Sequence, residues 1–168
     1  MSVVTWLETD RLLLRPSRIS DARALLAILG DEASRPHTFN LASLREARRY
    51  IAANECHRRK LGYGLWIVTE KSSGQIVGFG GLYDDPFDVL WGPEIAYHFT
   101  TDVRGEGYAT ELTLYALNTA REMNLAEVSA FAHPDNAASR RVLEKAGFIQ
   151  ERFIAGMNRH LYVRQLSA

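Results

Sequence analysis

The stretch FTTDVRGEGYATE, residues 99–111, gives the strongest indication of fold and ligand in this sequence. Residues 95–99 before it alternate as a strand does, and residues 108–123 after it have the apolar spacing of a long helix. A strand that enters a helix through glycines forms an anion site, because the first helical N–H groups lack partners within the helix. Gly105 and Gly107 have no Cβ, so a ligand oxygen can approach the main chain there. The stretch therefore predicts a phosphate-bearing ligand.

The same residues carry a family resemblance. Arg104, Gly107 and Ala109 match the Arg/Gln-x-x-Gly-x-Gly/Ala signature of the GNAT family of N-acetyltransferases. In that family the turn holds the pyrophosphate of acetyl-coenzyme A, and Arg104 could add a charge-assisted hydrogen bond to phosphate. The resemblance implies acetyl-CoA as co-substrate, with these binding residues: Phe99, Arg104, Gly105, Glu106, Gly107, Tyr108, Ala109, Thr110, Asn136 and Ser139.

Taken alone, the glycine turn leaves other interpretations open. It could be a plain connection between a strand and a helix, and Gly105-x-Gly107 also begins a dinucleotide-binding G-x-G-x-x-G pattern. The third glycine of that pattern is replaced by Thr110, and the turn follows several strands instead of the first one. Glu127 lies at a suitable distance for a ribose-binding acid and keeps the dinucleotide alternative open.

Composition narrows the function classes. The 168 residues are most simply one domain, residues 1–168, large enough to bury a core without disulfides or metal. Lys plus Arg and Asp plus Glu number 20 each, which disfavours a nucleic-acid or membrane-surface binder. The single cysteine, Cys56, cannot form an internal disulfide. The first residues do not read as a signal peptide and no apolar run is long enough to span a membrane, so we expect a cytoplasmic protein. No metal site is predicted.

Two further stretches strengthen the resemblance. Residues 7–16, LETDRLLLRP, are similar to the E-T-x-R-L-x-L-R opening of the GNAT branch that includes RimJ and RimL, which act on ribosomal-protein N-termini. Residues 136–148, NAASRRVLEKAGF, resemble the N-x-x-S-x-x-V-L-E-K-x-G-F block that follows the cofactor turn in the same branch. The chain is thus identified as a member of the GNAT family. The resemblance implies an α/β (α+β) fold with a mixed central sheet of about seven strands, about four helices, and strands splayed at the acetyl-CoA cleft.

The local patterns agree with that element order. A helix over residues 21–29 is expected to be capped by Ser20, and Ser43-Leu44-Arg45-Glu46 reads as a capping box that starts a helix to about residue 60. Glycines 78, 80 and 81 weaken their strand unless something packs against its backbone. The expected strands are residues 7–16, 65–69, 75–83, 93–99, 125–131, 148–152 and 161–166, and the expected later helices begin near residues 108 and 136.

Acetyl transfer from a thioester to an amine needs a neutral amine and a polarised carbonyl. In the family, the strand matching residues 94–99 splays at a bulge, and a backbone N–H near Phe99 donates to the thioester carbonyl. Glu94 begins this strand and is our candidate for the general base. His98 has the even spacing that gives it the same face as Glu94, so the base stays open between Glu94, His98 and a water chain.

The departing thiolate also needs stabilisation. Many family members carry a tyrosine that protonates it, and the matching place here is Leu143. The RimL-like pattern implies instead that Ser139 hydrogen-bonds the sulfur and that Asn136 contacts the pantetheine arm or an ordered water. Tyr97, Tyr108 and Tyr162 are alternative hydroxyls, and Ser139 could equally bond its own helical turn.

The sequence thus predicts an N-acetyltransferase that moves the acetyl group of acetyl-CoA to a primary amine by direct attack in a ternary complex. The resemblance favours the N-terminal α-amine of a peptide or protein as acceptor. A small-molecule amine is the alternative acceptor, and a non-catalytic acyl-CoA sensor is the alternative function. We expect a monomer or homodimer with no nucleic-acid or membrane partner.

Overall fold

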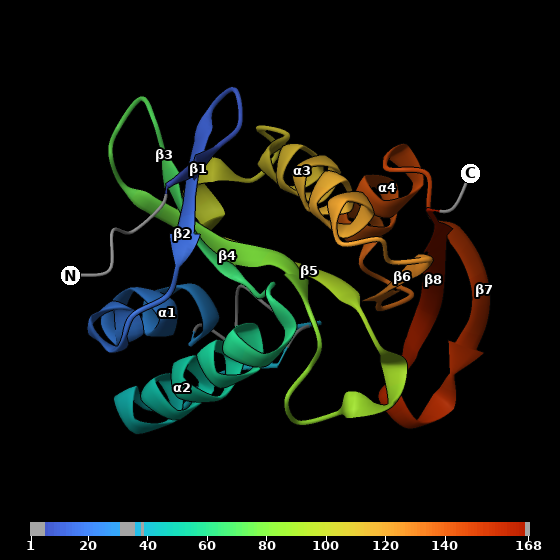
Figure 1. Ribbon diagram of the computed structural model, residues 1–168, viewed down its shortest axis with the longest axis horizontal. Coiled ribbons are helices and arrows are strands. Elements are labelled where there is room, and N and C mark those ends of the chain that lie inside the picture. Colours follow the sequence, from blue (N-terminus) through green and yellow to red (C-terminus); the bar gives the residue numbers. More distant parts are fainter. Residues whose placement is uncertain (1–5, 31–35, 38, 167–168) are drawn as a thin grey trace.

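One eight-stranded sheet forms the centre of the molecule (Figure 1). The computed structural model describes residues 6–30, 36–37 and 39–166. Its strands run in the order β1-β2-β3-β4-β5-β6-β8-β7, and among these neighbours only β5 and β6 are parallel. The strands are β1 (Leu7–Glu8), β2 (Leu12–Pro16), β3 (Trp66–Glu70), β4 (Ile76–Tyr83), β5 (Glu94–Phe99), β6 (Glu127–Ala132), β7 (Ile149–Ile154) and β8 (Arg159–Gln165). A dinucleotide-binding fold would need a mostly parallel sheet, so this topology excludes that alternative.

The expected mixed sheet is confirmed, with one strand more than the seven predicted. Residues 7–16 form two strands instead of one, because the polar residues between them make a tight turn. The Thr9 N–H donates to the Leu12 carbonyl at 3.0 Å, and the Leu12 N–H donates to Thr9 Oγ1 at 3.1 Å. Strand β2 ends at Pro16 as predicted, where no N–H is available.

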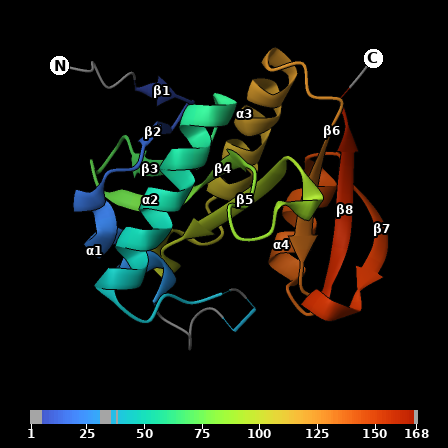
Figure 2. The same cartoon turned by 60° about the horizontal axis from the view of Figure 1, so that its bottom comes forward.

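In the part of the chain that the structure describes, four α-helices cover the sheet, in agreement with the prediction of about four. Helices α1 (Ala22–Leu29) and α2 (Leu44–Leu61) lie on one face, and α3 (Tyr108–Glu122) and α4 (Ala137–Lys145) lie on the other (Figures 1 and 2). Among the described residues, no helix is both long enough and apolar enough to cross a bilayer.

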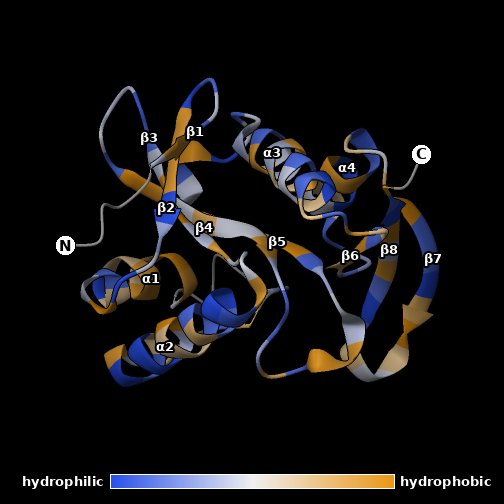
Figure 3. Ribbon diagram, in the orientation of Figure 1, coloured by the Kyte–Doolittle hydropathy of each residue, from blue (hydrophilic) through white to orange (hydrophobic). Residues whose placement is uncertain are grey.

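Both faces of the central strands are buried, which gives the molecule two cores. Neighbouring residues of β3 alternate between them: Trp66 and Val68 pack with α3, whereas Ile67 packs with α1 and α2. Side chains alternate across a strand, so a strand covered on both faces is apolar at successive positions. Figure 3 shows this apolar centre, with hydrophilic residues on the outward sides of the helices.

The structure confirms one of the two helix caps predicted from serine residues and contradicts the other. Ser43 Oγ accepts from the Glu46 N–H at 3.2 Å, which confirms the predicted cap of α2. The prediction for Ser20 is wrong, because Ser20 lies inside a 3₁₀ turn (Ile19–Asp21) that precedes α1. Asp21 makes the polar contacts there instead: its carboxylate accepts from the Arg18 N–H and from both terminal nitrogens of Arg15, all at 2.7 Å. A carboxylate paired with a buried guanidinium is a stronger acceptor than a serine hydroxyl.

The glycines of β4 let large side chains pack directly on its backbone. A Cβ at Gly78 would lie 2.7 Å from Cδ1 of Phe99, and one at Gly81 would lie 2.5 Å from Cε3 of Trp66. The Phe99 ring therefore packs directly against the backbone of β4, at the point where β5 meets the glycine turn. The expectation that something packs against these glycines is confirmed.

Candidate active site

A cavity of about 1080 Å³ opens where β5 and β6 separate. The two strands pair only at Glu94 and Ser129, where the Ser129 N–H donates to the Pro93 carbonyl at 2.9 Å. Beyond that pair they diverge, and residues 95–99 and 130–132 line the cavity from opposite sides. The predicted splay is confirmed. The predicted bulge in β5 is not found, since β5 pairs with β4 in unbroken register from Tyr83–Glu94 to Gly78–Phe99.

The glycine turn forms one end of the cavity. Gly107 is the N-cap of α3, with φ +83°, and makes no side-chain cap. Among the described residues, no main-chain acceptor is found for the N–H groups of Tyr108, Ala109 and Thr110. These donors, together with the positive end of the helix dipole, can bind a diphosphate. The arrangement fits acetyl-CoA, because Gly105 and Gly107 leave the main chain accessible and both line the cavity.

Arg11, from the turn between β1 and β2, holds the glycine turn from outside the cavity. Its Nη1 donates to the Glu106 carbonyl at 2.8 Å, and its Nε donates to Glu111 Oε2 at 2.7 Å. The Arg11 main-chain N–H and the Thr9 hydroxyl both donate to Glu111 Oε1, at 2.8 and 2.6 Å. The Arg11 guanidinium also lies 4.6 Å from the centroid of the Tyr108 ring. Side-chain contacts thus connect two stretches that carry the family resemblance.

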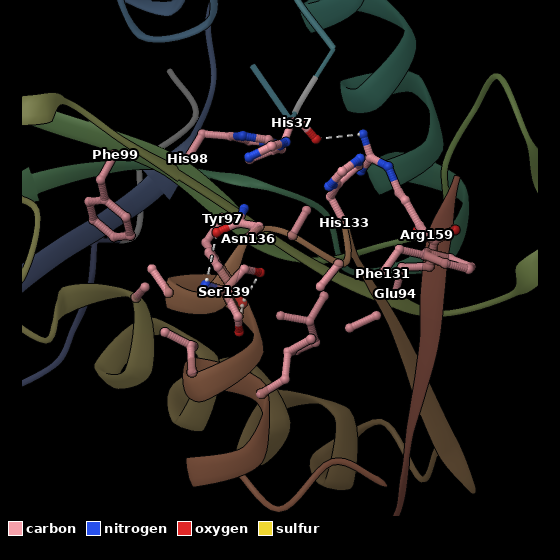
Figure 4. Close-up of a pocket in the computed structure, with 18 of the residues that line it drawn as sticks. His37, Glu94, Tyr97, His98, Phe99, Phe131, His133, Asn136, Ser139 and Arg159 are labelled. Atoms are coloured by element: carbon pink, nitrogen blue, oxygen red, sulfur yellow. Dashed lines mark hydrogen bonds between the residues drawn. The ribbon is translucent and has the colours of Figure 1, made fainter. Parts of the chain in front are cut away.

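Helix α4 supplies the wall opposite β5. Asn136 caps this helix through Oδ1, which accepts from the Ser139 N–H at 3.1 Å. The Ser139 hydroxyl lies 2.9 Å from the Tyr97 hydroxyl, which also donates to the Ser139 carbonyl at 3.2 Å (Figure 4). Burial raises the pKa of Tyr97 to about 12, so its phenol stays protonated near neutral pH. Leu143 is buried and also lines the cavity.

The edge of β5 that faces away from β4 lines the cavity. The Thr100 N–H bonds to the Val77 carbonyl of β4 at 2.8 Å, and main-chain groups alternate direction along an antiparallel strand. The N–H groups of Tyr97 and Phe99 therefore point away from β4, toward the gap left by β6. A strand of six residues spans roughly 20 Å. Strand β5 can therefore accompany the extended arm of coenzyme A from the glycine turn to Glu94.

Glu94 lies at the other end of β5 and is 7% exposed. Burial, followed by the negative charges of Asp85, Asp88 and Asp84, raises its pKa to about 8, while Arg159 opposes the shift. Among the described residues, no cation forms an ion pair with this carboxylate. A carboxyl group with a pKa near 8 is mostly protonated at pH 7, and its ionised form, which is a stronger base than an ordinary carboxylate, grows as the pH rises toward 8.

Aromatic side chains surround the space near Glu94. The rings of Tyr50 and Phe87 stack at a centroid distance of 6.0 Å, and Phe39 packs on Tyr50 at 5.1 Å and on His98 at 6.0 Å. These rings come from α2, from the segment before it, and from the loop between β4 and β5. We call this region, with Asp85 and Glu94, the Glu94 side. We call residues 104–110 with the α4 wall the glycine-turn side.

Three segments meet across the cavity near His37. The rings of His37 and His133 stack at 4.3 Å, and Arg159 donates from Nη2 to the His37 carbonyl at 3.0 Å (Figure 4). His133 follows β6, and Arg159 begins β8. The segment before α2 thus reaches the C-terminal half of the molecule beside the Glu94 side.

The cavity brings together nearly all of the residues predicted from sequence. Glu94, Phe99, Arg104, Gly105, Gly107, Tyr108, Ala109, Thr110, Asn136 and Ser139 all line it. Glu106 does not, and its carbonyl is instead held by Arg11. His98 also lines the cavity, together with the other residues of β5.

Sequence reasoning missed other cavity residues or left them unassigned. Tyr97 was one of several possible hydroxyls, and only its contact with Ser139 singles it out. Arg141 and Lys145 of α4 add positive charge to the cavity lining. The sequence pattern around them indicates a helix but does not indicate which of its side chains face a ligand. Tyr50, Asp85, Phe87 and Arg159 come from segments that the motifs do not cover. No group of three or more His, Cys, Asp or Glu in the part of the chain that the structure describes could hold a metal ion.

Comparisons with known proteins agree with this geometry. A family model described as "Acetyltransferase (GNAT) domain" matches residues 11–149. The uncharacterized protein YkkB of Bacillus subtilis is 29% identical over 165 residues, covering 97% of this chain and 96% of the relative. The uncharacterized N-acetyltransferase YoaA of Bacillus subtilis is 30% identical over 151 residues, covering 86% of this chain and 83% of the relative.

Solved structures share the fold. An acetyltransferase from Agrobacterium tumefaciens superposes with a TM-score of 0.84 at 19% identity, covering 98% of this chain and 96% of that chain. RimL, a ribosomal L7/L12 α-N-protein acetyltransferase, superposes with a TM-score of 0.77 at 20% identity, covering 96% and 94%. The family model covers most of the chain, and the glycine turn, splayed strands and α4 motif occupy one cavity. The chain belongs to the GNAT family of acetyltransferases, as an N-acetyltransferase that uses acetyl-CoA.

Proposed function

We propose that this enzyme acetylates the N-terminal α-amine of a peptide or protein. One observation carries the proposal: a single cavity joins an anion-binding glycine turn, one side of strand β5 and a buried carboxyl group with a pKa of about 8. The carboxylate also favours an enzyme over a non-catalytic sensor, since a sensor has no need of a perturbed base beside its ligand.

Each part of the cavity has a role in this proposal. Acetyl-CoA supplies an acetyl group activated as a thioester. The N–H groups at the start of α3 and the Arg104 side chain hold its diphosphate. The Phe99 N–H, directed away from β4, donates to the carbonyl that is attacked, where developing negative charge makes a fixed donor most effective.

Glu94 acts as the base in this proposal. A neutral amine is the nucleophile, so the acceptor's ammonium proton must leave before or during attack. Glu94 takes that proton directly or through water, and its desolvated position makes it basic enough to do so. His98, in the same cavity, is the second candidate for this role.

Two features support a peptide acceptor. The stretches at residues 7–16 and 136–148 are similar to those of RimJ and RimL, and RimL is named for acting on a protein α-amine. The loop between β4 and β5 exposes Phe87 by 65%, Val89 by 66% and Leu90 by 85% beside the Glu94 side, which gives apolar side chains of a peptide a surface to contact.

One observation favours a small amine as the second candidate. The His37–His133 stack and the Arg159 hydrogen bond to His37 tie the segment before α2 to the far wall of the cavity. Such a crossing narrows the access that an extended peptide would need, while a small amine would still fit.

An acceptor screen separates these functions. Purified protein is mixed with acetyl-CoA and one of three sets of acceptors, and the release of the coenzyme A thiol is followed. The sets are short peptides with free α-amines, the same peptides with blocked α-amines and a free lysine, and small amines. We expect release with free α-amines and, by mass spectrometry, acetyl on the terminal nitrogen. Transfer to small amines alone would assign the second candidate instead. Binding of acetyl-CoA by calorimetry with no transfer to any amine would favour the sensor.

A further inference from the structure

Many family members carry a tyrosine that protonates the thiolate, and this chain has Leu143 at that place. The hydroxyls of Tyr97 and Ser139 lie in the same cavity. Leu143, at the place of that tyrosine, is apolar and 1% exposed, so it offers no proton. Ser139 lies one helical turn before Leu143 and lines the same cavity. The only phenol that contacts Ser139 among the described residues comes from the opposite wall, from Tyr97 on β5. A phenol is thus present beside the serine, but it is supplied by the strand.

We propose that Tyr97 is a positioning residue that holds the Ser139 hydroxyl as a hydrogen-bond donor to the sulfur of coenzyme A. This inference rests on the proposed function, and on the role toward the sulfur that the family resemblance implies for Ser139. A serine hydroxyl has one proton and two acceptor positions. The Tyr97 phenol has one proton, and both the Ser139 carbonyl, at 3.2 Å, and Ser139 Oγ, at 2.9 Å, lie within its reach. When the phenol donates to Oγ, the serine proton is left to point into the cavity. The Asn136 Oδ1, which accepts from the Ser139 N–H, keeps the serine main chain in place.

The charge state of Tyr97 decides what it can contribute. Burial raises the pKa of Tyr97, so the phenol keeps its proton while the cavity is at neutral pH. A protonated phenol can act as the donor in a chain of two hydroxyls, from Tyr97 to Ser139 and from Ser139 to sulfur, and in that role it does not itself give up the proton. Hydrogen bonds in such a chain polarise one another, and a bond to an ionised acceptor is stronger than a neutral one. No covalent bond to the protein is formed or broken in this arrangement.

The measurement that tests this inference is the pKa of the coenzyme A thiol when bound. Free coenzyme A is added to the protein without any acceptor amine, and the ultraviolet absorbance of the thiolate is followed against pH. Cys56 is exposed and would titrate as well, so all proteins carry Cys56→Ser, and the titration of protein alone is subtracted. We expect the bound thiol to have a pKa about one unit below that of free coenzyme A in the same buffer.

Three variants locate the source of the shift. Ser139→Ala should return the thiol pKa to the value of free coenzyme A. Tyr97→Phe, which keeps the ring and removes one oxygen, should abolish at least half of the shift. Tyr162→Phe is the matched control, because Tyr162 is 1% exposed and its hydroxyl bonds to Gln150 and Arg140 outside the cavity lining. It should leave the thiol pKa unchanged.

Binding and turnover distinguish positioning from a general loss of structure. We expect Tyr97→Phe to keep the Kd of coenzyme A and the KM of acetyl-CoA within about two-fold and to lower kcat about ten-fold. Should Tyr97→Phe fold poorly, 3-fluorotyrosine at position 97 makes the phenol a better donor without changing the fold, and should lower the bound thiol pKa further.

Several results would overturn the inference. An unchanged thiol pKa in Tyr97→Phe, with the shift lost in Ser139→Ala, would show that serine acts alone. An equal effect of Tyr162→Phe would show a non-specific change in packing. The titration needs no acceptor, so the thiol pKa can be shifted even if the acceptor screen finds no substrate. Conversely, acetyl transfer can be observed while the thiol pKa is not shifted. A protein that bound no coenzyme A would overturn both proposals.

Discussion

The two ends of the cavity are built in different ways. The glycine-turn side consists of main-chain N–H groups from one continuous stretch, together with a wall from one short helix. The Glu94 side consists of side chains from four separated places: residue 39, α2, the loop between β4 and β5, and the start of β5. Main-chain donors fit any diphosphate, whereas a set of side chains can change with the acceptor. The comparison indicates that the first end is generic to the family and that the second carries specificity.

The charges of the two ends also differ. Arg104, Arg141 and Lys145 line the glycine-turn side, while Asp85 and Glu94 line the other, where Arg159 also lines the cavity and partly offsets their charge. A cationic end suits the phosphates of the donor, and an acidic end attracts an ammonium group. The same acidic neighbours raise the pKa of Glu94, so recruitment of the amine and its deprotonation depend on one cluster.

The largest expected effect comes from removing the carboxylate of Glu94. Glu94→Gln should lower kcat by about 10²–10³-fold at pH 7, because general-base assistance contributes in this range. In the parent enzyme kcat/KM should rise with pH through about 8, since Glu94 must be ionised to accept a proton. The variant should lose this dependence while it keeps its Kd for acetyl-CoA. Full activity of the variant across the pH range would assign the base to another group.

Gly107→Val probes the other end. The valine would have to adopt φ +83°, and its side chain would crowd the main chain that the diphosphate approaches. We expect the Kd for acetyl-CoA, measured by calorimetry, to rise at least ten-fold. Gly74→Val is the matched control, because Gly74 has φ +69° in the turn between β3 and β4, outside the cavity lining, with nothing within 4 Å of an added Cβ. If both variants bind acetyl-CoA equally, the turn does not hold the diphosphate.

Glu94 should also lower the stability of the fold. Its pKa is about 8 in the folded protein, against 4.5 for an unperturbed glutamate, so the folded state binds an extra proton between these pH values. The contribution of Glu94 to the free energy of unfolding therefore falls as pH rises from about 4.5 to 8. Glu94→Gln should raise the free energy of unfolding by about 1–3 kcal/mol above pH 8, and by less at pH 5. The exposed Glu151→Gln, measured by the same denaturant titration, should show no such difference.

Arg11→Ala tests the external support of the glycine turn. This change removes the hydrogen bonds to the Glu106 carbonyl and to Glu111, so we expect the Kd for acetyl-CoA to rise about 3- to 10-fold with little change in kcat. Lys71→Ala is the control, since Lys71 pairs with the exposed Glu8 in the same region. A double-mutant cycle with Glu111→Gln should show that the Arg11 and Glu111 effects are not additive.

The smallest expected effect is confined to the acceptor. Phe87→Ala removes a largely exposed ring that stacks on Tyr50, so the KM for the preferred amine should rise about two- to five-fold. The Kd for acetyl-CoA should not change. An effect on acetyl-CoA binding without one on the acceptor would mean that the two ends of the cavity are not separate.

The amino-acid sequence alone determined the parts that are local in the chain. The glycine turn, the Ser43 cap, the strands expected at residues 65–69 and 75–83, and the helix expected to begin near residue 136 all depend on residues within a few positions of one another, and the structure confirms them. The predictions failed where a contact from elsewhere decided the outcome. Ser20 lies inside a 3₁₀ turn and Asp21 occupies the N-cap position of α1, where its carboxylate pairs with Arg15 of β2 and makes no side-chain cap.

Only the tertiary structure decided the rest. Tyr97 meets Ser139 across 42 positions of the chain, and Arg11 meets Glu111 across 100. The pKa of Glu94 depends on burial and on three aspartates of a loop that no motif describes. Local pattern reports what a few neighbouring residues prefer, whereas desolvation and long-range contacts exist only once the sheet has brought distant segments together.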